Sequence, residues 1–123
     1  MLKKGVRHTS HTEVNTSNTA IMLGSGEMEV FATPAMVALM ENAAMNAVAP
    51  FLPEGCTTVG AKIDTSHIKP SGIGQHITAE AELIEIDGRK LTFKVSASDG
   101  VCTIGEGTHV RYIVDHTKFL SKL

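Results

Sequence analysis

The sequence predicts an α+β domain in which an antiparallel sheet wraps one long apolar helix. Three observations carry this prediction. Residues 31–52 form an apolar run whose middle holds only three polar side chains, Glu41, Asn42 and Asn46. Four segments follow in which apolar and polar residues alternate, as is typical of half-buried strands. Two Asp-Gly pairs separate the last three of these segments and indicate hairpin turns.

Composition limits the class of protein. With 123 residues, 42% of them apolar and 20% charged, the chain is expected to form one domain over residues 1–123. A net charge of −2 and the absence of tryptophan argue against nucleic-acid binding. We expect no membrane span and no secretory signal, because Glu41 interrupts the apolar run and the first 17 residues contain no apolar segment.

The cysteines and histidines indicate neither a metal site nor a cofactor. Cys56 and Cys102 lack the spacing of metal ligands and favour a reduced, cytoplasmic setting. Five histidines share no ligand spacing either, namely His8, His11, His76, His109 and His116.

The segment before the helix is predicted to contain one strand. Residues 1–12 are polar, and we expect them to be loosely packed. Side chains alternate weakly over residues 13–23, which predicts the first strand there. Gly24-Ser25-Gly26 is predicted to form a turn.

The helix has clear start and stop signals. Thr33 is predicted as its N-cap and Pro34 as its first residue, and Pro53 and Gly55 end it. Its apolar side chains spread almost all the way round, which is typical of a buried helix. One small sheet gives too little cover for such a helix, so we expect a two-fold homodimer or a higher oligomer.

The next strand is predicted over residues 57–69. Its alternation places five side chains on the face that should cover the helix: Val59, Ala61, Ile63, Thr65 and His67. His67 should therefore project toward the helix.

A meander is predicted for the remainder, with strands over residues 75–86, 89–98 and 101–114. The alternation slips at Leu83-Ile84, which indicates a bulge. Gly105 and Gly107 lie inside the last strand, where missing side chains indicate that another group packs closely.

Glu41 and His67 are the strongest candidates for chemistry. A carboxylate among apolar side chains needs a partner or a function. If helix and sheet pack face to face, His67 can meet Glu41, and such a pair can activate water or a substrate. Structural roles remain open for both, and Thr33 can be a plain N-cap. Gly60 could let a ligand approach its strand, and Arg111 could meet the phosphates of a nucleotide-bearing substrate.

Two motifs resemble the fluoroacetyl-CoA thioesterase-like family of the hotdog fold. They are VFATPAMVALMENAA and, about fifteen residues later, VGAKIDTSHIKP. The resemblance covers residues 10–115 and implies a helix held in a curled sheet, a dimer, and active sites near the subunit interface. It also implies that Thr33, Glu41 and His67 are catalytic and that Gly60 approaches the acyl group.

The function implied by the resemblance is hydrolysis of an acyl-CoA thioester to free acid and CoA. Fluoroacetate-specific members carry an aromatic lid before the helix, whereas residues 24–29 here are Gly-Ser-Gly-Glu-Met-Glu. We therefore expect a broader or different acyl-CoA substrate, with a short or medium acyl chain. Two alternatives remain open, a hotdog protein that binds acyl-CoA without cleaving it and a hotdog enoyl-CoA hydratase.

Overall fold

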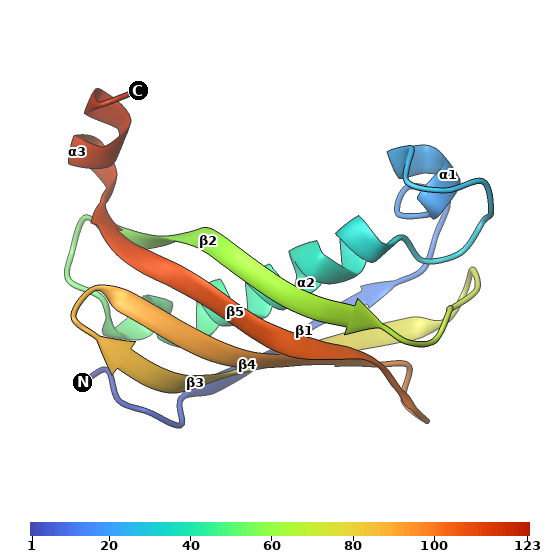
Figure 1. The fold of residues 1–123 in the computed structure, drawn as a ribbon, viewed down its shortest axis with the longest axis horizontal. Helices are drawn as coiled ribbons and strands as arrows, with labels where there is room; N and C mark the ends of the chain where they lie inside the picture. The colour runs from blue at the N-terminus through green and yellow to red at the C-terminus, as the bar shows by residue number, and fades with distance from the viewer.

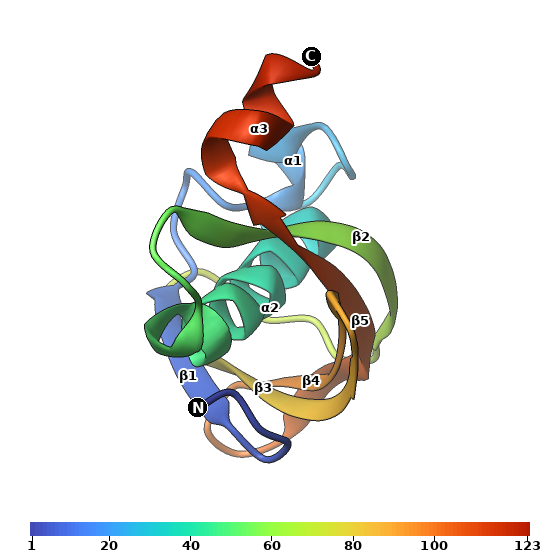
Figure 2. The same cartoon turned by 90° about the vertical axis from the view of Figure 1, so that its left-hand side faces the viewer.

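In the computed structural model, which describes residues 1–123, a curled antiparallel sheet encloses one long helix. The sheet runs in the order β1-β3-β4-β5-β2, and α2 lies along its concave side (Figures 1 and 2). The elements are β1 (Arg7–Glu13), α1 (Ala20–Leu23), α2 (Thr33–Val48), a 3-10 turn (Ala49–Phe51), β2 (Cys56–His67), β3 (His76–Asp87), β4 (Lys90–Ser98), β5 (Thr103–Asp115) and α3 (His116–Ser121). This arrangement confirms the predicted fold class.

The core forms where α2 meets the sheet. Met36, Met40, Ala43 and Ala44 are fully buried on one side of the helix. A side chain at Gly105 of β5 would come 2.5 Å from the Met36 sulfur, so the glycine makes room for that methionine. This explains the first of the two strand glycines that the sequence singled out.

The opposite side of α2 is not covered within one chain. Ala38 and Asn42 are exposed, and Val37 and Met45 are only partly buried. One sheet therefore leaves part of the helix uncovered, as the sequence predicted; cover by a second subunit stays a prediction.

The predicted first strand is wrong. The strand forms earlier, where β1 pairs with β3 from Arg7 opposite Glu82 to Glu13 opposite His76. Side chains of Asn15 and Asn18 bond to nearby backbone groups and turn the chain directly after β1. Thr19 then caps α1 by accepting a hydrogen bond from the Met22 amide.

The meander is confirmed with changes in its details. The β3–β4 register shifts between Leu83 and Glu85, where the alternation slips. The loop at Asp99 is not a two-residue hairpin, because β4 ends at Ser98 and β5 begins at Thr103. The short helix α3 was not predicted; the Asp115 side chain caps it by accepting from the Lys118 amide.

Candidate active site

Thr33 and His67 form a hydrogen-bonded pair at the beginning of α2. The Thr33 hydroxyl lies 2.7 Å from Nδ1 of His67, the last residue of β2. Thr33 is not the N-cap: Ala32 holds that position and makes no side-chain cap bond. Its hydroxyl is therefore directed to the imidazole and not to the helix backbone.

The other ring nitrogen of His67 is unsatisfied. Nε2 is buried and has no hydrogen-bond partner within the chain. Burial lowers the pKa of His67 from its ordinary value of 6.5, and the backbone at Lys69 opposes this effect. The ring is consequently neutral near pH 7, and Nε2 is a buried polar atom that lacks a partner in the chain.

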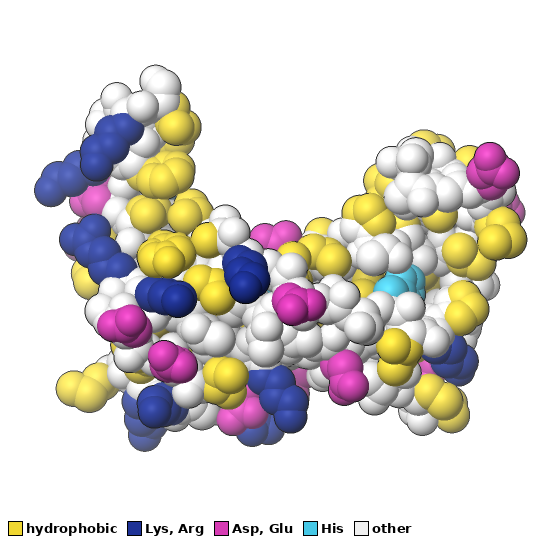
Figure 3. Space-filling view, viewed as in Figure 1, with side chains coloured by type: hydrophobic (Ala, Val, Ile, Leu, Met, Phe, Trp, Pro, Cys, Tyr) yellow, Lys and Arg dark blue, Asp and Glu magenta, His cyan; other side chains and the backbone are white.

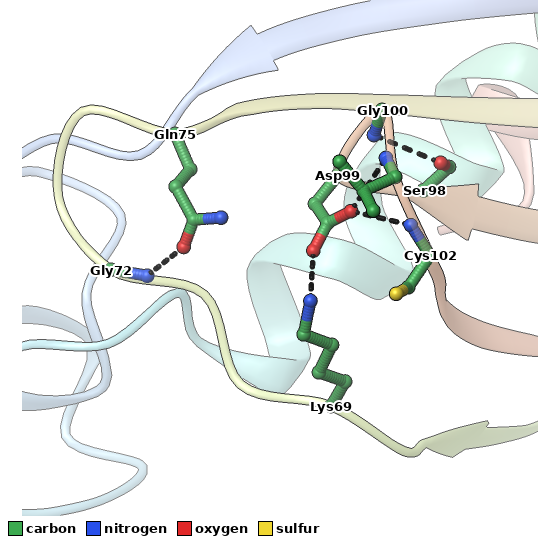
Figure 4. Close-up of polar contacts among 8 residues, drawn as sticks. Lys69, Gly72, Gln75, Ser98, Asp99, Gly100 and Cys102 are labelled. Atoms are coloured by element: carbon green, nitrogen blue, oxygen red, sulfur yellow. Dashed lines mark hydrogen bonds and ion pairs between the residues drawn. The ribbon is translucent and has the colours of Figure 1, made fainter.

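An ion pair fixes the chain directly after His67. Lys69 Nζ lies 2.6 Å from Oδ2 of Asp99, and Oδ1 of Asp99 accepts hydrogen bonds from the amides of Val101 and Cys102 (Figure 4). These bonds hold the pKa of Asp99 well below its usual range, with the Lys69 contact as the largest cause. The loop between β4 and β5 thereby anchors the end of β2 that carries His67.

Glu41 lies farther along α2 and contacts the middle of β2. A side chain at Gly60 would come 2.5 Å from Oε2 of Glu41, so the carboxylate occupies the space above this glycine. A bulge between Gly60 and Lys62 shifts the pairing of β2 with β5. This bulge reverses the predicted facing of the first half of β2, where Thr58 is buried in place of Val59.

Arg111 of β5 is buried beside Glu41. Its residue is 6% exposed, Nε and Nη2 donate to the hydroxyl and carbonyl of Thr58, and Nη1 lies 3.5 Å from Oε2 of Glu41. Burial lowers the pKa of Arg111 from its ordinary value, and the Glu41 carboxylate opposes this effect. With these internal partners, Arg111 is not a free surface cation of the kind expected for binding nucleotide phosphates.

The expected contact between His67 and Glu41 is not made within one chain. Because α2 and β2 run in opposite directions, Thr33 meets His67 at one end and Glu41 meets Gly60 farther along. The eight residues from Thr33 to Glu41 correspond to about 12 Å of helix. Face alternation placed His67 toward the helix, but it could not specify which turn of the helix His67 meets.

Two small cavities accompany these two groups. One of about 230 Å³ is lined by residues that include Thr33, His67 and Phe31. The other, about 180 Å³, is lined by residues that include Glu41, Gly60 and His109. A larger cavity of about 430 Å³ lies under α3 and contains none of the predicted site residues.

Sequence reasoning missed two polar residues near Glu41. Thr58 binds Arg111, and His109 lies 3.2 Å from Arg111 through its Nε2 atom. The positions of His109 and Arg111, two residues apart on one strand, offered a signal that they share a face. No group of three or more His, Cys, Asp or Glu residues is placed to hold a metal ion. None of the helices has the length and apolar character needed to span a bilayer.

A central helix held in a curled five-stranded antiparallel sheet is the hotdog fold. The family model described as fluoroacetyl-CoA-specific thioesterase matches residues 14–117. A fluoroacetyl-CoA thioesterase from Streptantibioticus cattleyicolor is 44% identical over 95 residues, which are 77% of this chain and 68% of the relative. The chain belongs to the fluoroacetyl-CoA-specific thioesterase family and is an acyl-CoA thioesterase.

Solved structures agree with this assignment. The fluoroacetyl-CoA thioesterase FlK superposes with a TM-score of 0.93 at 38% identity, covering 99% of this chain and 95% of FlK. A threonine-to-serine variant of FlK in complex with acetyl-CoA gives 0.91 at 37% identity, over 98% and 96%. A thioesterase superfamily member from Thermus thermophilus gives 0.89 at 24% identity, over 98% and 89%, and supports the fold alone.

Proposed function

We propose that the protein hydrolyses short acyl-CoA thioesters at a site that two subunits build together. Thr33 and His67 of one subunit act with Glu41 and Gly60 of the partner subunit. The observation that carries this proposal is the buried, unpartnered Nε2 of His67, together with the separation of His67 from Glu41 within the chain.

An edge strand provides a place for the second subunit. β2 is the last strand of the sheet, so its outer edge has no partner in the chain. If two β2 strands pair antiparallel about a two-fold axis at Asp64, the one-residue bulge between Gly60 and Lys62 brings His67 of one subunit opposite Gly60 of the partner subunit. Residues that face each other in an antiparallel pair project on the same side of the sheet. The imidazole would then point toward Glu41 of the partner subunit.

The shape of this face also favours a second copy. α1 and α3 rise at the two ends of the molecule, and the surface between them is hollowed and carries apolar side chains (Figures 1 and 3). Partly exposed Val37 and Met45 belong to the uncovered side of α2. Burial of these side chains against a partner would stabilise the homodimer through the hydrophobic effect.

The residues divide the chemistry as follows. The Glu41 carboxylate activates a water molecule or attacks the thioester carbonyl itself. If water attacks, Glu41 takes a proton from it, the proton passes to the neutral Nε2 of His67, and His67 delivers it to the sulfur as the carbon–sulfur bond breaks. If Glu41 attacks directly, CoA leaves as the thiolate, and a water molecule then hydrolyses the mixed anhydride and supplies the proton that the sulfur takes up. Thr33 holds the ring in place through Nδ1. The products are a free acid and CoA.

The acyl group is proposed to be short. Within one subunit the cavity beside Glu41 has a volume of about 180 Å³, a space that suits a small acyl group. Variants of FlK have been crystallised in complex with fluoroacetate and CoA and with acetyl-CoA. Residues 24–29 contain no aromatic side chain. We therefore propose that the enzyme accepts acetyl-CoA and similar small thioesters and is not selective for fluoroacetyl-CoA.

A thiol-release assay over a panel of acyl-CoAs tests the proposal. Wild-type protein should release CoA fastest from chains of two to about four carbon atoms, and Glu41→Gln should abolish release. Full activity in Glu41→Gln would contradict the assigned site. Tight binding without release across the panel would identify a binding protein, and addition of water to crotonyl-CoA without release would identify a hydratase.

A further inference from the structure

We propose that His109 is a positioning residue that holds both neighbours of Glu41, Arg111 and the Gly60 bulge, in their active geometry. This inference rests on the proposed role of Glu41. His109 lies on β5 and is 1% exposed, so solvent does not determine its hydrogen bonds.

The hydrogen bonds of His109 define one tautomer. Arg111 carries only donors, so Nε2 of His109 accepts from Nη1 of Arg111 at 3.2 Å. Nδ1 must then carry the proton, and it donates to the carbonyl of Lys62 at 2.7 Å. Burial lowers the pKa of His109 from its ordinary value, which favours the neutral ring that this arrangement requires.

One end of the ring fixes the strand bulge. Lys62 directly follows the register shift in β2, where regular pairing with β5 is interrupted. The bond from His109 to the Lys62 carbonyl replaces part of the lost pairing and holds Gly60 close to the Glu41 carboxylate. A side chain at Gly60 would lie 3.4 Å from Cε1 of His109, so the ring also closes this side of the space.

The other end of the ring aims the guanidinium. Thr58 binds Nε and Nη2 of Arg111, which leaves Nη1 for His109 and Glu41. Without the acceptor on His109, Nη1 loses its only uncharged partner and the guanidinium can tilt about its bonds to Thr58. A shift of about 1 Å in a catalytic group can cost about a hundredfold in rate. Loss of the hydrogen bond from Arg111 to His109 is therefore expected to lower the rate.

Variants at position 109 test the proposal. His109→Phe keeps a flat ring and removes both nitrogens, and His109→Gln keeps an acceptor and a donor. We expect His109→Phe to lower kcat for acetyl-CoA about tenfold with KM changed less than about twofold, and His109→Gln to recover most of the loss. His8→Phe, an exposed position on β1, serves as the matched control and should match the wild type.

A double-mutant cycle with Arg111→Met separates positioning from a general loss of structure. Because His109 acts partly through Arg111, His109→Phe should cost clearly less activity once Arg111 is replaced, and the remaining loss belongs to its contact with Lys62. An equal loss in both backgrounds, or a loss confined to KM, would overturn the proposal. Nitrogen-15 NMR of the ring provides a measurement independent of activity: a proton on Nδ1 supports the proposal, and a proton on Nε2 contradicts it.

These outcomes are distinct from failure of the proposed function. Wild-type protein without thiol release, or an active Glu41→Gln variant, would refute the thioesterase site itself. Normal Glu41 dependence with a fully active and stably folded His109→Phe variant would refute only the role of His109.

Discussion

Replacement of Gly60 by alanine should slow thioester hydrolysis about a hundredfold while the fold is retained. The added Cβ would lie 2.5 Å from Oε2 of Glu41 and 3.3 Å from Nη1 of Arg111. An ordinary contact is about 3.5 Å, so the carboxylate must move by about 1 Å. A displacement of that size costs about a hundredfold in rate, or about 2.7 kcal/mol in the activation free energy.

Stability should respond much less than activity to this substitution. The Glu41 side chain is 39% exposed, so its carboxylate can move aside without disturbing the core. We therefore expect the free energy of unfolding to change by less than about 1 kcal/mol. Thiol release from acetyl-CoA and a thermal melt measure the two effects on the same sample.

Gly72→Ala is the matched control for this experiment. The nearest atom to a side chain there is Oε1 of Gln75, at 3.9 Å, which is an ordinary contact. This variant should retain nearly full activity. A Gly60→Ala enzyme with more than about half of the wild-type rate would refute the reasoning, because the carboxylate would then not need its observed place above the glycine.

Three further predictions concern the other end of the site. Thr33→Val should lower kcat/KM about tenfold or more by releasing His67, whereas Thr33→Ser, which keeps the hydroxyl, should retain most of the wild-type kcat/KM. Equal losses for the two variants in steady-state assays would contradict a role for the hydroxyl. The rate should decrease as the pH falls, with the midpoint of this acid limb below pH 6.5, because burial lowers the pKa of His67 and protonation occupies Nε2. A midpoint above pH 6.5 would contradict this prediction. Asp99→Asn should lower the melting temperature above about pH 4, because the ionised carboxylate of Asp99 stabilises the fold through Lys69. The difference in melting temperature between wild type and variant should shrink at lower pH, where the carboxylate becomes protonated. A constant difference across the pH range would be evidence against the Lys69 contact.

Periodicity and turn signals were sufficient to predict the helix and the four strands after it. Burial of Met36 and Met40 against the sheet follows directly from the apolar run, and the register shift at Leu83 appears as a slip in the alternation. These features are local in the sequence, so the pattern of apolar side chains determines them.

The start of the chain could not be predicted in this way. Residues 7–13 are mostly polar, yet they pair with β3 because an open strand edge is available there. The alternation over residues 13–23 gave way to side-chain bonds from Asn15 and Asn18 and to the Thr19 cap. Tertiary pairing and local capping outweighed weak strand propensity.

The sequence predicted which residues belong to the candidate site, but not which of them contact one another. The alternation in β2 correctly directed His67 toward the helix, but the bulge after Gly60 left no signal and turned Thr58 inward. The partners of Arg111 depend on that bulge, and so does the place of His109. The relation between His67 and Glu41 requires the direction of β2 against α2, which no single segment encodes.

Mixed dimers provide the most direct test of the composite site. Two inactive chains, Glu41→Gln and His67→Ala, are produced together with different affinity tags, and the dimers that carry both tags are purified. In the proposed arrangement, one site of each mixed dimer combines the intact His67 of one subunit with the intact Glu41 of the partner subunit. The mixed dimer should therefore recover about half of the wild-type rate of thiol release. Mixed dimers as inactive as their parents, or a protein that remains monomeric while fully active, would contradict the account.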